Sequence, residues 1–145
     1  MVREAKENDL LNLLSLYQQL FPEENYNRSS EFHSTWKKII NDKKIKCFLA
    51  FSGDIAVASC LIIVIPNLTR NQRPFAVIEN VITHKDYRKK GFGKAVIEKA
   101  VNFGKRQNCY KIMLLSSTNR TDAHIFYEKI GFDGNSKQGF QLRLP

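Results

Sequence analysis

The sequence of 145 residues contains no apolar run long enough to cross a membrane. Its longest apolar run, from Ala56 to Ile65, is interrupted by Ser59, whereas a membrane-spanning helix needs about 20 predominantly apolar residues. The first residues, MVREAKEND, carry too much charge for a signal peptide. We therefore expect a cytoplasmic protein that does not associate with membranes.

Cysteine is scarce, which argues against a disulfide framework. The three cysteines (Cys47, Cys60 and Cys109) are odd in number, lie within apolar stretches and lack the paired spacing of a zinc site. We interpret them as reduced residues of the core, and we expect no metal site.

Acidic residues are few relative to basic ones. The chain has 14 Asp and Glu against 23 Lys and Arg, and its net charge is +9. Such a charge favours an anionic partner, which could be a nucleotide, a nucleic acid or an anionic membrane, although a basic surface also serves solubility. The composition is otherwise that of a globular protein, and its length predicts a single domain over residues 1–145.

The spacing of apolar residues predicts the element order βααβββαβαβ, with one further short strand near Phe132. Strands are expected at residues 2–5, 46–52, 55–65, 75–82, 110–116 and 140–144. Helices are expected after a cap at Asn8 or Asp9, after a cap at Ser29 or Ser30, from Gly93 to about Gln107, and across 119–130. PEENYNRSS separates the first two helices as a polar loop.

A mixed sheet follows from this order. A helix connects strands 75–82 and 110–116, so these two strands should be parallel. We therefore predict an α/β (α+β) fold, in which a central mixed sheet carries helices on both faces.

The segment HKDYRKKGFGKAVIEK gathers positive charge between a predicted strand and a predicted helix. Lys85, Arg88, Lys89 and Lys90 precede two glycines, Gly91 and Gly93. The positive end of the helix dipole adds to this charge, so the arrangement repels itself unless an anion binds there. The glycines let the backbone turn tightly and present its N–H groups, as phosphate-binding loops do.

Three better-known nucleic-acid or phosphate motifs do not fit this segment. A P-loop requires Ser or Thr after Gly-Lys, but Ala95 follows Lys94. The dinucleotide fingerprint requires a third glycine where Val96 stands. A DNA-reading helix would begin with polar residues, whereas this helix begins with Ala95, Val96 and Ile97.

Two motifs together resemble those of the GNAT superfamily of N-acetyltransferases. VITHKDYRKKGFGKAVIEKAV resembles its acetyl-CoA-binding motif, and NRTDAHIFYEKIGF resembles its second signature about 30 residues later. The element order agrees along nearly the whole chain. The resemblance implies the GNAT acyl-CoA N-acyltransferase fold, acetyl-CoA as co-substrate, and direct attack of a substrate amine on the thioester in a ternary complex.

The resemblance also implies roles for individual residues. Backbone N–H groups from Arg88 to Lys94 would bind the CoA pyrophosphate, and those of Val81, Ile82 and Thr83 would pair with the pantetheine and polarise the thioester. Tyr127 would be the general acid, since a phenol with the ordinary pKa near 10 is protonated at neutral pH. Asn119 would contact the pantetheine or cap the following helix. In full, the implied cofactor-binding residues are Val81, Ile82, Thr83, Arg88, Lys89, Lys90, Gly91, Phe92, Gly93, Lys94, Asn119 and Tyr127.

The general base has two candidates. Glu79 lies on strand 75–82, where family members place a base that acts through water, and burial would make its carboxylate a better base. The alternative reading of Glu79 is a salt-bridged structural carboxylate. His84 titrates near neutrality without any perturbation, but its position beside the phosphate loop favours contact with a phosphate.

The acceptor is read as a small anionic amine. Parts of the sequence resemble aminoalkylphosphonate and glucosamine-6-phosphate N-acetyltransferases, and Arg70 and Arg73 place positive charge on the loop 66–74, which we expect to border the acceptor pocket. A protein or peptide acceptor is an alternative, as is a non-catalytic module that binds acyl-CoA or nucleic acid. The basic residues are spread along the chain without interleaved aromatics, so we expect no nucleic-acid partner. A homodimer stays open.

Overall fold

The structure is a computed structural model that describes residues 1–26 and 29–145. Its chain forms two compact units, Met1–Ile112 and Met113–Pro145, and each is described by itself. The prediction of one domain over residues 1–145 stays a prediction. The predicted polar loop before the second helix includes Asn27 and Arg28, which lie outside the described residues.

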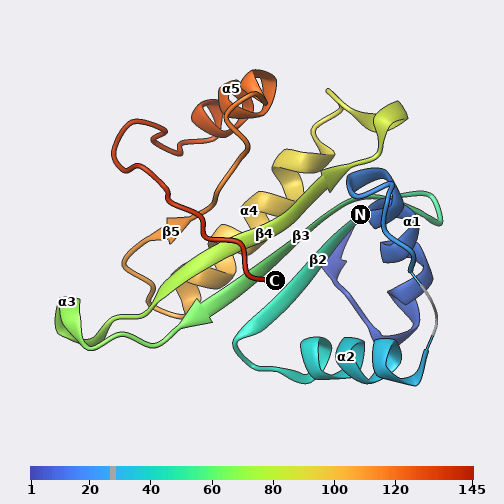
Figure 1. The fold of residues 1–145 in the computed structure, drawn as a ribbon, viewed down its shortest axis with the longest axis horizontal. Coiled ribbons are helices and arrows are strands. Elements are labelled where there is room, and N and C mark those ends of the chain that lie inside the picture. The colour runs from blue at the N-terminus through green and yellow to red at the C-terminus, as the bar shows by residue number, and fades with distance from the viewer. Residues whose placement is uncertain (27–28) are drawn as a thin grey trace. The chain divides into compact units, whose positions relative to one another are not determined.

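The predicted mixed sheet is confirmed, and it has five strands in the order β1-β2-β3-β4-β5 (Figure 1). The strands are β1 Val2–Glu4, β2 Ile45–Ser52, β3 Ile55–Ile65, β4 Phe75–Thr83 and β5 Ile112–Met113. Neighbours from β1 to β4 are antiparallel. A tight turn joins β2 to β3, and Gly53 supplies the positive φ of +58° that this turn requires.

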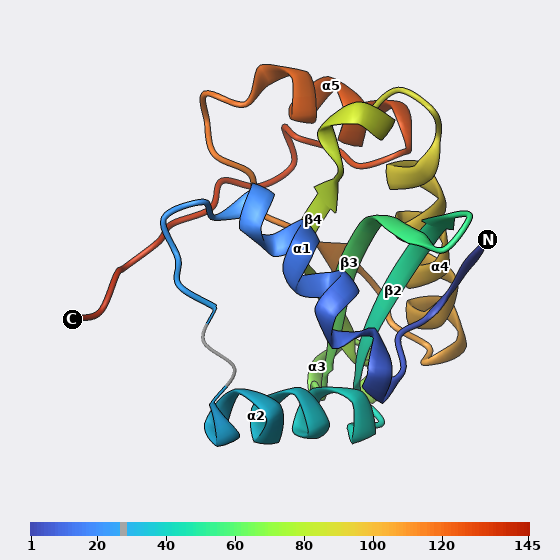
Figure 2. The same cartoon turned by 90° about the vertical axis from the view of Figure 1, so that its right-hand side faces the viewer.

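Helices cover both faces of the sheet, as predicted. The helices are α1 Leu10–Leu20, α2 Ser30–Asn41, α3 Thr69–Gln72, α4 Phe92–Arg106 and α5 Thr121–Lys129, with short 3-10 turns at Glu7–Asp9 (η1) and Lys85–Tyr87 (η2). Figure 2 shows α1 in front of β3 and α4 behind it.

The alternation along β2 explains this arrangement, because successive side chains of a strand point to opposite faces. Cys47, Leu49 and Phe51 join a buried cluster with α1 and with Trp36 of α2. Phe48, between them, turns to the other face, where its ring lies 6.5 Å from that of Phe103 on α4.

Helix α4 connects β4 to β5, and the strands run in the same sense. The N–H of Tyr110 donates to the carbonyl of Pro74 at 2.9 Å, and the N–H of Ala76 donates to the carbonyl of Lys111 at 3.0 Å. From the first hydrogen bond to the second, the residue number increases on both segments. This is the pattern of parallel pairing, which the connecting helix predicts.

The starts of α1 and α2 lie where the sequence predicts them, but the cap of α1 differs. Ser29 caps α2 and accepts a hydrogen bond from the N–H of Phe32 at 3.3 Å. Asp9 stands at the start of α1 without capping it. Its carboxylate instead accepts from both Nη atoms of Arg3, at 2.6 and 2.9 Å, and from the N–H of Lys6 at 2.7 Å.

The strand expectations for the C-terminal part of the chain are wrong. Strand 110–116 shortens to Ile112–Met113, and the structure assigns no strand to 140–144 or near Phe132. Phe132 belongs to the end of α5, because its N–H donates to the carbonyl of Tyr127 at 3.0 Å. Residues 140–144 alternate as a strand does, but no strand among the described residues pairs with them.

Two of the three cysteines are core thiols, as expected. Cys47 and Cys60 are buried and free, and burial raises the pKa of Cys47 to about 12. Cys109 is only half-buried, at the end of α4. The described part of the chain contains no cluster of metal ligands, and none of its helices has the length and apolar character needed to cross a membrane.

Candidate active site

A β-bulge interrupts β4 where the sequence places the reacting thioester. On β3 one residue lies between Ser59 and Leu61, whereas on β4 two residues lie between their partners Ile82 and Glu79. Asn80 absorbs the extra residue with a φ of +51°, a conformation that asparagine tolerates better than most residues. The bulge returns Ile82 to the face covered by α1, where it joins the core.

The bulge is tied to α1 through Tyr17. The side chain of Asn80 forms a hydrogen bond with the Tyr17 hydroxyl, and burial raises the pKa of this phenol far above its ordinary value. The Tyr26 hydroxyl donates in turn to the carbonyl of Tyr17 at 3.2 Å. A protonated, buried phenol therefore holds the irregular part of β4 in place.

The three residues proposed to pair with pantetheine follow the bulge. Val81 and Thr83 are half-buried, and Ile82 is buried. Ile82 and Thr83 pair with Ser59 and Ala58 of β3. Ser59 is fully buried, and its hydroxyl has no hydrogen-bond partner among the described residues.

His84 ends β4 and shapes the turn that follows. Its N–H donates to the carbonyl of Val57 at 2.8 Å, and its Nδ1 accepts from the N–H of Asp86 at 3.3 Å, as the cap of η2. Its ring stacks edge-on against Tyr87, with centroids 5.4 Å apart. Through these contacts His84 stabilises the turn that leads into the basic loop.

The basic loop reaches α4 with two residues in the left-handed region. Lys89 has a φ of +61°, and Gly91, which precedes the helix, has a φ of +85°. A Cβ built on Gly91 would meet nothing within 4 Å. The N–H of Ala95 donates to the carbonyl of Gly91 at 3.0 Å, while the N–H groups of residues 92–94 find no acceptor in the described parts of the chain.

The start of α4 therefore presents unpaired backbone N–H groups next to basic side chains. No side chain caps the helix within the described residues, so its first-turn N–H groups and the positive end of its dipole face outward. The surrounding basic side chains are exposed. Arg88 Nε donates to the carbonyl of Thr83 at 3.4 Å, and Lys90 Nζ donates to that of Asp86 at 3.1 Å, so both side chains also brace the loop.

Glu79 lies beside the bulge, but it is not buried as expected. It pairs with Leu61 of β3, which packs against the core covered by α1, yet the carboxylate itself is exposed. The expected burial of Glu79 is therefore wrong. A salt bridge is also absent for Glu79 among the described residues.

The second unit holds Tyr127 on α5. Its ring packs against those of Phe126 and Phe132, with centroids 5.2 and 6.0 Å away. Gly131 turns the chain with a φ of +102° so that Phe132 folds back over the helix end. The segment FYEKIGF is thus a helix terminus that fixes the ring of Tyr127.

Asn119 does not cap α5. The residue at the cap position is Arg120, and Asn119 lies exposed in the turn before it. The same turn accepts a hydrogen bond from His124, because the Nε2 of this ring lies 2.9 Å from the carbonyl oxygen of Ser117. His124 is therefore a local structural residue of the second unit.

The loop 66–74 does not lie near the bulge. It precedes β4, and at about 3.3 Å per residue Phe75 and Ile82 are on the order of 20 Å apart. Arg73 donates to the carbonyls of Asn108 and Cys109 at 3.2 and 3.1 Å, in the turn that follows α4, and the Arg70 guanidinium lies over Tyr110, 5.6 Å from its ring centroid. The expectation that this loop borders the acceptor pocket stays a prediction.

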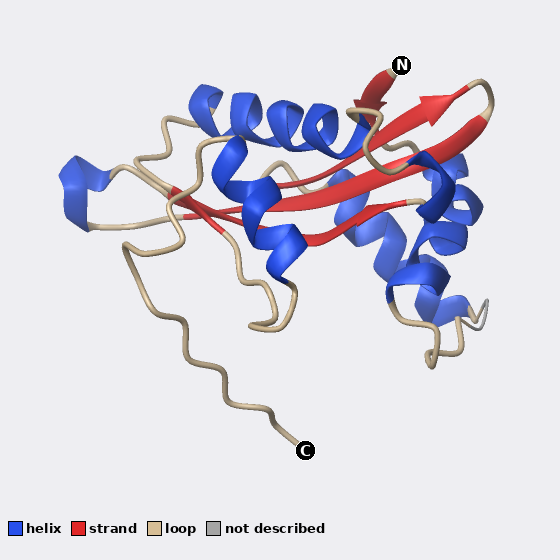
Figure 3. Ribbon diagram, turned by 90° about the horizontal axis from the view of Figure 1, so that it is seen from above, coloured by secondary structure: helices blue, strands red, loops and turns tan. Residues whose placement is uncertain are grey.

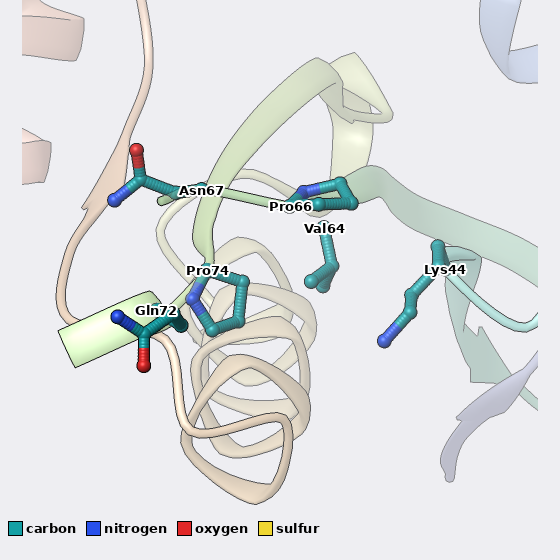
Figure 4. A pocket seen from close by; sticks show the side chains of 6 residues that line it. All are labelled: Lys44, Val64, Pro66, Asn67, Gln72 and Pro74. Atoms are coloured by element: carbon teal, nitrogen blue, oxygen red, sulfur yellow. The ribbon is translucent and has the colours of Figure 1, made fainter. Parts of the chain in front are cut away.

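That end of the sheet has a shallow hollow of its own. Its volume is about 210 Å³, and Lys44 lies across it from Gln72 and Pro74 (Figure 4). Lys44 Nζ is engaged with Gln107 Oε1 at 3.0 Å. The hollow therefore lacks a free charged group among its lining residues.

A larger hollow of about 400 Å³ lies along α1. Its lining residues are Leu11, Leu14, Ser15, Gln18, Gln19 and Tyr26. Tyr26 connects it to the bulge through Tyr17, and Gln19 Oε1 accepts from the N–H of Lys85 at 3.1 Å. Amide and hydroxyl groups beside an aromatic ring suit a polyhydroxylated ligand.

Sequence reasoning missed Tyr17 and Asn80. The signal for Asn80 was an asparagine in the middle of the strand FAVIENVI, since asparagine is depleted in strands and tolerates a positive φ. Tyr17 carried no such signal, because it follows the apolar spacing of α1.

Comparison with known proteins gives a consistent picture. The model of the Acetyltransferase (GNAT) family matches residues 10–132. A solved structure from Agrobacterium tumefaciens str. C58, assigned to the acetyltransferases, is similar with a TM-score of 0.93 and 37% identity over 99% of both chains. A transcriptional regulator from Bacillus halodurans C-125 has a TM-score of 0.90 and 28% identity, also over 99% of both chains.

A curated relative adds a named activity. Glucosamine 6-phosphate N-acetyltransferase from Trypanosoma brucei brucei is 35% identical over 82 residues, which are 57% of this chain and 54% of that protein. The chain thus spans about half the length of this relative.

Proposed function

Since this chain belongs to the GNAT acetyltransferase family, we propose that it transfers an acetyl group from acetyl-CoA to a primary amine. The observation that carries the proposal is the uncapped start of α4, where Gly91 opens the backbone beneath exposed basic side chains. Free N–H groups at a helix start bind phosphate oxygens. Only the short turn η2 separates the end of β4 from this loop. A thioester bound beside the bulge would therefore lie close in the sequence to the site of the pyrophosphate, as acetyl-CoA requires.

Each chemical step has an assigned group in this proposal. The amine nitrogen attacks the thioester carbonyl carbon, and backbone N–H groups beside the bulge, at Val81 to Thr83, polarise the carbonyl oxygen. The carbon–sulfur bond then breaks, and the Tyr127 hydroxyl gives its proton to the departing thiolate. Glu79 accepts the proton of the amine through water. The assignments of Tyr127 and Glu79 rest on the motif resemblance.

For the acceptor we propose an amino sugar phosphate, bound in the hollow along α1. The relative from Trypanosoma supports this class by its name. Ser15, Gln18 and Gln19 offer amide and hydroxyl groups for sugar hydroxyls, and Tyr26 offers a ring face. Lys85, whose backbone contacts Gln19, supplies a nearby positive charge for the phosphate.

Cofactor binding is tested by a matched pair of glycine variants. Gly91→Val and Gly53→Val both place a side chain at a positive φ with open space around the Cβ, but only Gly91 lies at the loop. We expect Gly91→Val to weaken CoA binding at least tenfold, about 1.4 kcal/mol, and Gly53→Val to leave it within a few-fold. Calorimetry on folded protein measures both. Equal CoA affinity in both variants would refute the phosphate loop, and we expect Gly93→Val to behave as Gly91→Val does.

The acceptor is tested by thiol release from acetyl-CoA. Glucosamine 6-phosphate should be acetylated faster than glucosamine, because only the former carries a phosphate, and Lys85→Gln should reduce this preference. A preference for peptide amines would exclude the sugar. CoA binding without turnover on any amine, together with retention on DNA, would favour a non-catalytic module instead.

A further inference from the structure

We propose that Gln18 and Gln19, two neighbouring glutamines of α1, orient the acceptor by offering it opposite hydrogen-bonding groups. Gln19 presents amide N–H groups to the phosphate, whereas Gln18 presents its amide oxygen to the sugar hydroxyls. The inference rests on the proposed function, because it takes the hollow along α1 as the acceptor site. It adds which end of the acceptor lies beside which residue.

Both glutamines line the hollow of about 400 Å³, but they have different neighbours. Helix α1, which carries them, and helix α4 lie on opposite sides of the strand layer (Figure 3). Consecutive residues of a helix are about 100° apart around its axis. Gln18 is accordingly exposed, whereas Gln19 is half-buried. Two side chains of identical chemistry therefore form different contacts.

The amide of Gln19 is held by the turn that leads into the basic loop. The N–H of Lys85 donates to Gln19 Oε1 at 3.1 Å. A backbone N–H can only donate, so the side-chain atom that it meets must be the amide oxygen. The Nε2 of Gln19 keeps both N–H groups, and neither has an acceptor among the described residues. Gln19 therefore offers the hollow hydrogen-bond donors.

The amide of Gln18 is held in the opposite sense. Its Nε2 donates to the carbonyl of Pro22 at 3.0 Å, and a carbonyl oxygen can only accept. The Oε1 of Gln18 thus stays an acceptor that no donor of the described residues uses. The Tyr26 hydroxyl adds a second acceptor, because its hydrogen is engaged by the carbonyl of Tyr17 at 3.2 Å.

An amino sugar phosphate carries the complementary groups at separate ends. Phosphate oxygens are strong acceptors and suit the N–H groups of Gln19, whereas sugar hydroxyls can donate to Gln18 and Tyr26. The residue that holds Gln19 is itself a lysine, Lys85, so a positive charge accompanies the donors. This unit charge exceeds the partial negative charge, about half a unit, at the C-terminal end of a helix such as α1. The phosphate is therefore assigned to the Gln19 end of the hollow.

Substitutions at the two positions should act on different parts of the acceptor. Gln19→Glu keeps an oxygen for the N–H of Lys85 but replaces the free donors with negative charge. We expect the ratio of kcat/KM for glucosamine 6-phosphate to that for glucosamine to fall about tenfold or more, the scale of a hydrogen bond to a charged group. Gln18→Leu removes an acceptor that both sugars use, so both values should fall about threefold while their ratio stays within about twofold. Gln72→Glu, the same change at an exposed residue of α3, is the control and should leave the ratio unaltered.

Binding of glucose 6-phosphate separates this inference from the proposed reaction. This sugar has the phosphate but no amine, so it can occupy the hollow without being acetylated. Calorimetry should show binding about tenfold weaker in Gln19→Glu than in the wild type. The Kd of CoA should change no more than about threefold, because the variant retains the contact with Lys85.

The outcomes are distinguishable. An unaltered ratio in Gln19→Glu, or an equal loss of the ratio in Gln18→Leu, would overturn the orientation while acetylation of the sugar stands. Glucose 6-phosphate binding that follows the expected pattern, without turnover of either amino sugar, would refute the reaction alone. A wild-type protein that neither binds glucose 6-phosphate nor acetylates either amino sugar would overturn both.

Discussion

Three residues in unusual backbone conformations lie where we place the reaction. Asn80, Lys89 and Gly91 all have a positive φ and lie within twelve positions of one another along the chain. A non-glycine residue in this region costs about 1 kcal/mol or more. Such strain persists where the surrounding structure holds it, and in this protein Tyr17 holds Asn80 through a hydrogen bond.

At the same scale, Tyr127→Phe should separate binding from chemistry. The variant keeps the ring that packs against Phe126 and Phe132 but loses the proton donor, so we expect kcat to fall tenfold to a thousandfold, on the order that acid catalysis contributes. The Kd for acetyl-CoA should change by no more than a few-fold. Tyr110→Phe, which removes a hydroxyl outside the proposed site, is the control. Full activity in Tyr127→Phe would leave Tyr127 a packing role only.

The general base is tested by two variants on either side of residue 80. Glu79→Gln keeps the shape of the side chain but cannot accept a proton, so we expect lower turnover at neutral pH that partly recovers at higher pH, as free amine increases. His84→Ala should act mainly on cofactor binding, because His84 caps the turn before the basic loop. Rate profiles against pH distinguish the two.

Two other outcomes of that experiment have definite meanings. A Gln variant with the wild-type profile, combined with loss of the acidic limb in His84→Ala, would make His84 the base. Unchanged profiles in both variants would mean that the amine loses its proton to bulk water.

At the scale of elements, β4, the basic loop and α4 act as one unit. The bulge sets which face Ile82 occupies, η2 turns the chain, and Gly91 starts the helix with its donors uncovered. A change that alters the bulge should therefore affect the position of every later backbone donor, even though no reacting group is removed.

Substitutions at the bulge test this coupling. Asn80→Gly retains a residue that adopts a positive φ, whereas Asn80→Val does not. We expect Asn80→Val to lower kcat at least tenfold, and Asn80→Gly to stay closer to the wild type. Tyr17→Phe should lower the free energy of unfolding by about 1 kcal/mol for the lost hydrogen bond and reduce kcat more than Tyr26→Phe does. Equal kcat in the two Asn80 variants would show that the bulge does not position the site.

At the scale of the whole molecule, a partly buried ion pair joins the N-terminal strand to the turn before the first helix. The hydrogen bond from Arg3 holds the pKa of the Asp9 carboxyl below its ordinary value, and the Asp9 side chain is only 6% exposed. Nearby, the Trp36 indole donates to the carbonyl of Glu7 at 2.9 Å, which ties α2 to the same turn.

This pair predicts a pH dependence of stability. A carboxyl with a lowered pKa in the folded protein adds stability at pH values above its unfolded pKa, near 3.9, and loses it as the pH falls through the folded pKa. Asp9→Asn should lower the free energy of unfolding at pH 7 by about 2 kcal/mol, the scale of a hydrogen bond to a charged group.

Urea unfolding at pH 7 and pH 3 measures this effect. The difference between wild type and Asp9→Asn should shrink at the lower pH. Glu7→Gln, which removes the exposed pair with Lys37, should cost no more than about 0.5 kcal/mol. A difference for Asp9→Asn that is independent of pH would indicate lost packing in place of the ion pair.

Apart from α3 and the two 3-10 turns, the sequence by itself determined the order of elements up to α5. It also determined the start of α4 at the basic loop, the cap at Ser29 and the family resemblance. These features depend on local signals, such as the spacing of apolar residues, glycine conformations and short motifs, which neighbours in the chain supply. For this reason most of the predicted cofactor loop, from Arg88 to Lys94, lies together at one helix start.

Only the tertiary structure decided which residues that are distant in the sequence contact one another. Asn80 bulges because β3 pairs with both sides of it and Tyr17 of α1 contacts it. Arg73 donates to two carbonyls of the turn that follows α4, far away in the sequence. Glu79 is exposed, and residues 140–144 have no strand partner among the described residues. Burial and pairing depend on which segments meet in space, and alternation along one segment cannot specify its neighbour.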